Sequence, residues 1–246
     1  MTSELEQRVV RHSPSTGAGS PHVWGIYEPD TGSIQYICTD PATRKAALID
    51  VVWNFDPASF ATSTQSIDQV LNLVKEHGLT VERVLDTHPH ADHVMASAHL
   101  KARTGAPNAI GAKVREIAQL WRDYYNTPDA FDPEADFDDL FEDGATFDVG
   151  DLTVRVMLSP GHTLGSITYV CGDAAFVHDT FMQPDSGTSR ADFPGGSADD
   201  LWQTLQAILD LPGNTRLFVG HDYGADGRDR PEWEATVDDH KARNVH

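Results

Sequence analysis

Apolar residues recur along the chain with two periods, one typical of β-strands and one typical of amphipathic helices. Alternating or continuous apolar runs rich in Val, Ile, Tyr and Phe predict strands, whereas apolar residues three or four positions apart predict helices. The predicted strands are SIQYICTD, KAALIDVVW, VERVLDTH, the pair within TFDVGDLTVRVMLS, the pair within SITYVCGDAAFVHD, and RLFVG. The predicted helices cover residues 66–77, 94–104, 112–125 and 198–210.

Turn and capping residues separate these elements. The segment TDPATR between the first two strands predicts an antiparallel hairpin, and Gly150 and Gly172 mark two further hairpins. Ser66 is expected to cap the first helix, while Gly78 and Gly105 follow the ends of the first and second helices. The chain therefore divides into short, well-bounded elements without an internal repeat.

The order of the elements predicts an α/β protein. Strands come in two batches, each accompanied by helices, so two face-to-face β-sheets covered by helices on both outer sides fit the pattern. This is a four-layer αββα arrangement. We expect residues 1–22 to be a flexible N-terminal arm, 23–246 to be a single domain, and the acidic stretch 126–144 to be a surface insertion.

Charge and composition narrow the classes of partner. The 246 residues carry a net charge of −20, which opposes binding to nucleic acids and anionic membranes. The first 20 residues contain no apolar leader core, and no apolar stretch approaches the length of a membrane span, so we expect a cytoplasmic protein. Cys38 and Cys171 lie within strand-like runs, where a buried thiol is favoured over a disulfide.

Several potential metal ligands follow predicted strands. The segment THPHADH supplies four of them within six positions, and three more stand after later apolar runs, where side chains at a sheet edge converge. Chance histidines in a polar loop are the alternative interpretation, but the combined pattern favours metal binding. The seven candidate ligands are His88, His90, Asp92, His93, His162, Asp179 and His221.

This pattern resembles the signature of the metallo-β-lactamase superfamily, HxHxDH followed by a distant His, an Asp and a final His. The resemblance covers about residues 30–225, and all seven of its ligand positions are filled. It implies the αββα metallo-β-lactamase sandwich, with a metal site at one edge of the two sheets.

Within that superfamily, residues 179–223 look like the persulfide dioxygenase group and its β-lactamase-related hydrolases. The resemblance implies one Fe(II) held by His88, His162 and Asp179. It also implies catalytic support from the side chains around them, among which we single out Asp92, His93 and His221.

Two further residues are candidates for substrate binding. The resemblance matches Arg190 to an arginine that binds the glutathione carboxylate, although Arg190 could instead pair with a nearby aspartate. Tyr223 is a candidate substrate contact or an ordinary packed tyrosine.

Two imidazoles and one carboxylate are the ligand set of non-haem Fe(II) oxygenases, whereas Zn²⁺ is redox-inert. The implied reaction oxidises glutathione persulfide with O₂ to sulfite and glutathione. The expected partners are thus O₂ and a small thiol-derived substrate, with a homodimer left open.

Two other functions are carried as alternatives. The first is a zinc hydrolase with one or two Zn(II) ions, similar to glyoxalase II and acting on a glutathione thioester. Only 25 residues follow His221, which is short for the helical glutathione-binding segment of that family. The second is a catalytically inactive ligand-binding protein, which the complete set of candidate ligands disfavours.

Overall fold

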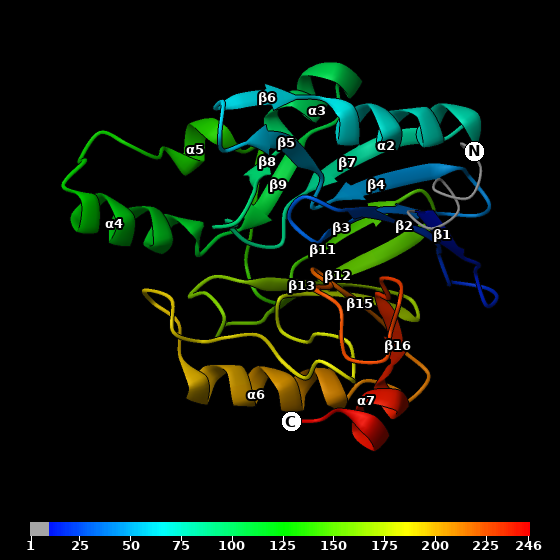
Figure 1. The fold of residues 1–246 in the computed structure, drawn as a ribbon. Helices are drawn as coiled ribbons and strands as arrows, with labels where there is room; N and C mark the ends of the chain where they lie inside the picture. The colour runs from blue at the N-terminus through cyan, green and yellow to red at the C-terminus, as the bar shows by residue number, and fades with distance from the viewer. Residues whose placement is uncertain (1–9) are drawn as a thin grey trace.

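Two β-sheets lie face to face in the middle of the molecule, with helices on both outer sides (Figure 1). The structure is a computed structural model and describes residues 10–246. The layers follow the order helix, sheet, sheet, helix, as the sequence pattern predicts. Each sheet has one face on the shared core, and central strands such as β3 and β14 are buried on both sides, whereas β11 and β12 alternate buried and exposed residues.

The first sheet has seven strands in the order β1-β2-β3-β4-β7-β9-β10. Pairing is antiparallel from β1 to β4 and parallel from β4 through β7 and β9 to β10. Its strands are β1 (Val10–Ser13), β2 (His22–Glu28), β3 (Ser33–Thr39), β4 (Lys45–Ile49), β7 (Thr80–Leu85), β9 (Asn108–Gly111) and β10 (Asp139–Phe141).

The second sheet has six strands in chain order, antiparallel except where β14 pairs with β15. Its strands are β11 (Thr146–Val149), β12 (Leu152–Leu158), β13 (Ile167–Cys171), β14 (Ala174–His178), β15 (Arg216–Val219) and β16 (Glu234–Thr236). A small third sheet joins β6 (Ala61–Ser63), β5 (Val52–Asp56) and β8 (Val94–Met95).

Helices cover the two outer faces and extend from one end. In Figure 1, α2 and α3 lie over the first sheet, α6 and α7 lie over the second, and α4 with α5 project as an arm on the left. The helices are α2 (Gln65–Glu76), α3 (Ser97–Thr104), α4 (Val114–Tyr125), α5 (Pro133–Asp136), α6 (Ala198–Leu209) and α7 (Val237–Arg243). None of the helices in residues 10–246 combines the length and apolar character needed to cross a bilayer.

The main apolar core lies between the two sheets. Tyr36 of β3 packs edge-on against Phe176 and Phe218, which stack on each other with ring centroids 5.2 Å apart. Cys38 and Cys171 are buried in the same core as free thiols, as predicted. A second core packs Ile67 and its neighbours on α2 against the outer face of the first sheet.

Several local predictions are wrong, among them the single strand KAALIDVVW, which is divided into β4 and β5 of different sheets, and the helix start at residue 94, because Val94–Met95 form β8. Residues 10–13 of the expected arm form strand β1, paired with β2, while residues 1–9 lie outside the described part of the chain. The expected insertion 126–144 contributes helix α5 and strand β10, which extends the first sheet. Helix α2 begins after Thr64, and the side-chain oxygen of Asn54 accepts from the Ser66 backbone N–H at 2.8 Å, so Ser66 is inside the helix.

Candidate metal centre

The seven predicted metal-site residues gather where four strands end. His88, His90, Asp92 and His93 follow β7, whereas the other three follow β12, β14 and β15 in turn. Ligand atoms of His88, His90 and Asp179 lie within 4.8 Å of one another, as do those of His90, Asp92 and His93. His162 joins the cluster with Nε2 at 3.5 Å from Asp179 Oδ2, and His221 lies beside the same carboxylate.

A chain of hydrogen bonds orients the His88 ring. The Thr87 hydroxyl donates to Asp50 Oδ2 at 2.8 Å, so its oxygen is left to accept from His88 Nδ1 at 3.0 Å. Burial raises the pKa of Asp50, but the hydrogen bond from His90 and the charges of the nearby histidines lower it overall, which keeps this carboxylate an acceptor. The lone pair of His88 Nε2 therefore faces Asp179 Oδ2, 3.6 Å away.

His162 is oriented in the same way by a backbone group. Its Nδ1 lies 3.0 Å from the carbonyl oxygen of Arg190, which can only accept, so Nδ1 carries the proton and Nε2 the lone pair. Burial raises the pKa of Asp179, but the charge and hydrogen bond of His221 hold it well below its usual range. Asp179 is thus ionised.

Two imidazole nitrogens therefore approach one carboxylate oxygen without a proton between them. Ligand atoms on one ion, each about 2.1 Å from it, lie roughly 3.0–3.4 Å apart. The distances of 3.6 Å and 3.5 Å from Asp179 Oδ2 to His88 Nε2 and His162 Nε2 are close to this spacing. Each of the two imidazole–carboxylate pairs therefore fits coordination of a metal cation, which would satisfy the nitrogen lone pair and the carboxylate together.

His221 lies between two carboxylates, and each of its ring nitrogens contacts one of them. Its Nδ1 is 2.6 Å from Asp179 Oδ1 and its Nε2 is 2.7 Å from Asp92 Oδ2. Burial alone would lower the pKa of His221, but the charge of Asp179 and the hydrogen bonds to both carboxylates raise it to about 10. In this arrangement His221 donates from both ring nitrogens and holds Asp92 and Asp179 in place.

His90 and His93 each keep one ring nitrogen free for a metal. His90 Nε2 is 3.4 Å from Asp50 Oδ1, and His93 Nδ1 is 3.1 Å from the Ser33 hydroxyl. Among the side chains of residues 10–246, the opposite atoms, His90 Nδ1 and His93 Nε2, are buried without a hydrogen-bond partner. His90 and His93 can therefore add metal-binding nitrogens to the ligand atoms of His88, His162 and Asp179.

The model of the metallo-beta-lactamase superfamily matches residues 36–221, from β3 to the last histidine of the cluster. The chain belongs to this superfamily. The match spans both sheets and all seven predicted ligands, and it confirms the predicted fold.

Related proteins align over most of this chain. A beta-lactamase hydrolase-like protein of Xylella fastidiosa is 56% identical over 227 residues, covering 92% of this chain and 52% of that protein. The human mitochondrial persulfide dioxygenase ETHE1 is 29% identical over 227 residues, covering 90% of this chain and 77% of that protein. The crystal structure of ETHE1 from Myxococcus xanthus superposes with a TM-score of 0.69 and 30% identity, covering 90% of this chain and 82% of the other. The chain spans about half the length of the Xylella relative.

Arg190 and Tyr223, the two predicted substrate-binding residues, line a cavity of about 560 Å³ beside the metal centre. Thr188 and Ser189 line the same cavity. The guanidinium of Arg190 pairs with Asp192, with Nη2 2.8 Å from Oδ2, as the alternative interpretation anticipated. Tyr223 is 68% exposed and stacks on the His221 ring with centroids 5.3 Å apart. Both residues thus face the space where a metal-bound substrate would lie, and their contact with substrate remains a prediction.

Three residues that support the site were missed from the sequence. Asp50 and Thr87 orient His88, and the hydroxyl of Ser33 lies 3.1 Å from both His93 Nδ1 and His221 Nε2. The sequence does give a sign of the role of Asp50. This carboxylate directly follows the buried strand β4, whose parallel neighbour β7 leads into the histidine motif. Ser33 and Thr87 give no such sign, since a hydroxyl at a strand end is common.

Proposed function

We propose that this chain is an iron(II)-dependent persulfide dioxygenase that acts on glutathione persulfide. The observation that carries the proposal is the three-residue group of His88, His162 and Asp179, in which both imidazoles present Nε2 to one carboxylate oxygen. Two histidines and one carboxylate are typical of non-haem iron(II) oxygenases. His221, a further candidate ligand for a second metal, is hydrogen-bonded to Asp92 and Asp179.

The proposed reaction is GSSH + O₂ + H₂O → GSH + SO₃²⁻ + 2 H⁺, where GSSH is glutathione persulfide. Iron held by His88, His162 and Asp179 would supply the redox chemistry of O₂, which zinc lacks. The similarity to the persulfide dioxygenase ETHE1 supports this reaction class.

The residues around the metal ligands have distinct tasks in this proposal. His221 holds the Asp179 carboxylate through Oδ1, which leaves Oδ2 directed at the two imidazoles. Arg190 has five N–H donors, of which the pair with Asp192 takes two, so it can also bind a glutathione carboxylate. Tyr223 lines the same cavity.

The proposal is tested by oxygen uptake. The chain is loaded anaerobically with Fe(II) or Zn(II), mixed with glutathione persulfide, and followed with an oxygen electrode and a sulfite assay. We expect one sulfite per O₂ with Fe(II) and none with Zn(II). Oxygen uptake no faster than that of free Fe(II) would refute the proposal.

One observation favours a binuclear zinc hydrolase as the second candidate. His93 Nε2 is buried without a partner in the described part of the chain, and His90, Asp92 and His93 form a group that can hold a second ion. Such a site would activate water for attack on a glutathione thioester. Hydrolysis of S-lactoylglutathione by the zinc-loaded chain, with two zinc ions bound, would support this candidate.

A further inference from the structure

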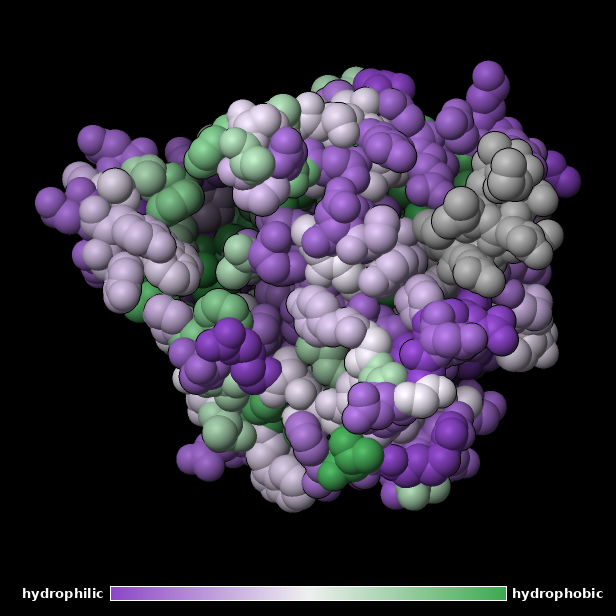
Figure 2. Space-filling view, viewed as in Figure 1, coloured by the Kyte–Doolittle hydropathy of each residue, from purple (hydrophilic) through white to green (hydrophobic). Residues whose placement is uncertain are grey.

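A second cavity opens on the other side of the metal centre. It has a volume of about 410 Å³, within the range of small-molecule pockets, and lies between helix α4 and the histidine loop. Figure 2 shows it as a hollow lined with hydrophobic residues, beside the projecting α4–α5 arm. Its apolar walls include Met95, Ile117, Trp121, Tyr125 and Phe131.

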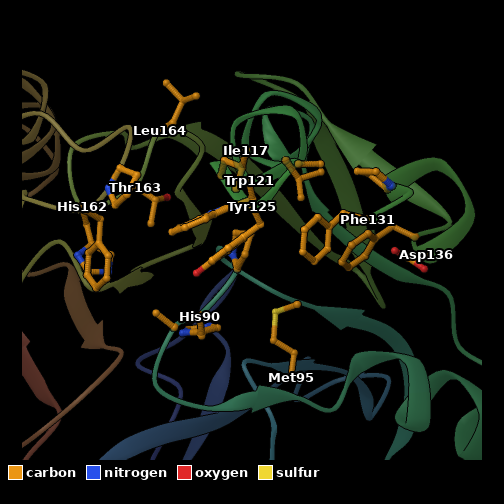
Figure 3. A pocket seen from close by; sticks show the side chains of 18 residues that line it. His90, Met95, Ile117, Trp121, Tyr125, Phe131, Asp136, His162, Thr163 and Leu164 are labelled. Carbon is orange, nitrogen blue, oxygen red and sulfur yellow. The ribbon is translucent and has the colours of Figure 1, made fainter. Parts of the chain in front are cut away.

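The cavity is continuous with the metal centre. His90 and His162 form one end, and Phe131 and Asp136 form the other, with Trp121 and Tyr125 between them (Figure 3). His162 lines both this cavity and the one that contains Arg190. A ligand held here can therefore place its reactive end beside His162.

The chemistry of the walls disfavours a glutathione carboxylate. The lining, all within residues 10–246, contains no lysine or arginine, and its one carboxylate is Asp136. A buried carboxylate without a cationic partner is strongly disfavoured. Glutathione persulfide bound at Arg190, in the other cavity, would leave this space unused.

The aromatic side chains at the mouth point to an apolar occupant. Tyr125 and Phe131 are 60% and 52% exposed, and the ring of Trp121 stacks on Tyr125 with centroids 5.2 Å apart. Large apolar side chains left exposed around a concave surface are typical of a binding site. A ring or branched chain in the cavity would cover them.

We propose that this cavity binds the aromatic or branched aliphatic group R of low-molecular-weight persulfides, R–S–SH, with the sulfur end toward His162. The inference rests on the proposed dioxygenase function and adds a second substrate class to it. The reaction is RSSH + O₂ + H₂O → RSH + SO₃²⁻ + 2 H⁺. The S–S bond breaks, three S–O bonds form, four electrons pass from sulfur to O₂, and RS⁻ takes up one proton.

Binding of unreactive thiols tests the cavity directly. Phenylethanethiol, ethanethiol and glutathione are titrated anaerobically into the Fe(II)-loaded chain by calorimetry. We expect phenylethanethiol to bind at least about tenfold more tightly than ethanethiol, because only the former has a ring to bury. Trp121→Ala should remove most of that difference, and Ala118→Leu, which fills the cavity, should do the same. Trp202→Ala, an exposed tryptophan on α6, is the matched control and should not.

Oxygen uptake separates this inference from the proposed function. We expect oxygen uptake with both glutathione persulfide and phenylethyl persulfide. Trp121→Ala should lower the rate with phenylethyl persulfide relative to the rate with glutathione persulfide. Uptake with glutathione persulfide, but equal binding of the phenyl and ethyl thiols, would overturn the cavity assignment alone. Absence of uptake with any persulfide would overturn both the proposed function and the persulfide class, whatever the thiols do.

Discussion

His162 Nδ1 lies 3.0 Å from the backbone carbonyl oxygen of Arg190, so the loop that carries the predicted substrate-binding arginine also orients a proposed metal ligand. The contact uses the main chain of Arg190, while its side chain faces the cavity beside Asp192. Metal binding and substrate binding at this residue can therefore be separated by substitution.

Arg190→Ala should weaken substrate binding and leave the metal in place. The loss of a charge-assisted hydrogen bond should raise KM for glutathione persulfide roughly tenfold or more, while the carbonyl that orients His162 is retained. Steady-state kinetics and iron analysis check this prediction. Arg243→Ala, another exposed arginine paired with an aspartate, is the control. Iron loss in Arg190→Ala would mean that its side chain supports the fold of the loop.

Asp179→Asn should remove most of the iron and reduce activity at least about 100-fold. The amide has a similar shape but lacks the negative charge that binds the cation between it and the two Nε2 atoms. The chain should remain folded because its core is large, and circular dichroism checks this.

His93→Ala should behave differently from Asp179→Asn. In the proposed arrangement, His93 lies outside the three-residue group, so the iron content should stay close to that of the unmodified chain. Equal metal loss in the two variants, measured by elemental analysis, would contradict the assignment of His88, His162 and Asp179.

Gly220→Ala should displace the metal-binding carboxylate. A Cβ at this position would lie 2.5 Å from Asp179 Oδ1, so the side chain must shift. We expect reduced iron affinity with the fold retained. Gly105→Ala is the matched control: it strains a left-handed helix cap, with nothing within 4 Å of the new Cβ, and should cost about 1 kcal/mol of stability without changing iron binding. Unchanged iron affinity in Gly220→Ala would show that the carboxylate position is not critical.

His240 on α7 should make the protein less stable in acid. Burial lowers its pKa to about 4, despite the opposing charge of Asp239, whereas the unfolded chain has a value near 6.5. Below pH 6.5 His240 is protonated in the unfolded state but stays neutral in the folded state. The free energy of unfolding therefore falls by roughly 3 kcal/mol between about pH 6.5 and pH 4. His240→Gln should flatten this part of the profile in urea unfolding of the metal-free chain. Identical pH slopes for both proteins would contradict it.

The positions of the metal ligands were predictable because each follows a recognisable strand. His162, Asp179 and His221 lie far apart in sequence, yet all stand at strand ends, and strand ends meet at a sheet edge. The layers of helices and sheets were predictable from periodicity, because each helix and strand carries its own pattern of apolar positions, which become its buried face.

Features that depend on distant partners were not predictable. Strand β1 exists because Val10–Ser13 pair with β2, and the short sequence has no pattern of its own. The cap of α2 comes from Asn54, twelve residues away, and the Thr87–Asp50 bond depends on the register between β4 and β7. Whether residues 23–246 form one domain, and whether the protein dimerises, stay predictions.

The metal content of the chain after anaerobic loading with Fe(II) tests the central claim most directly. Elemental analysis and a titration of Fe(II) should both give one tightly bound iron per chain, lost in His88→Ala, His162→Ala and Asp179→Asn. Two equally tight ions per chain, with the second lost in His93→Ala, would contradict the mononuclear site and favour the binuclear hydrolase.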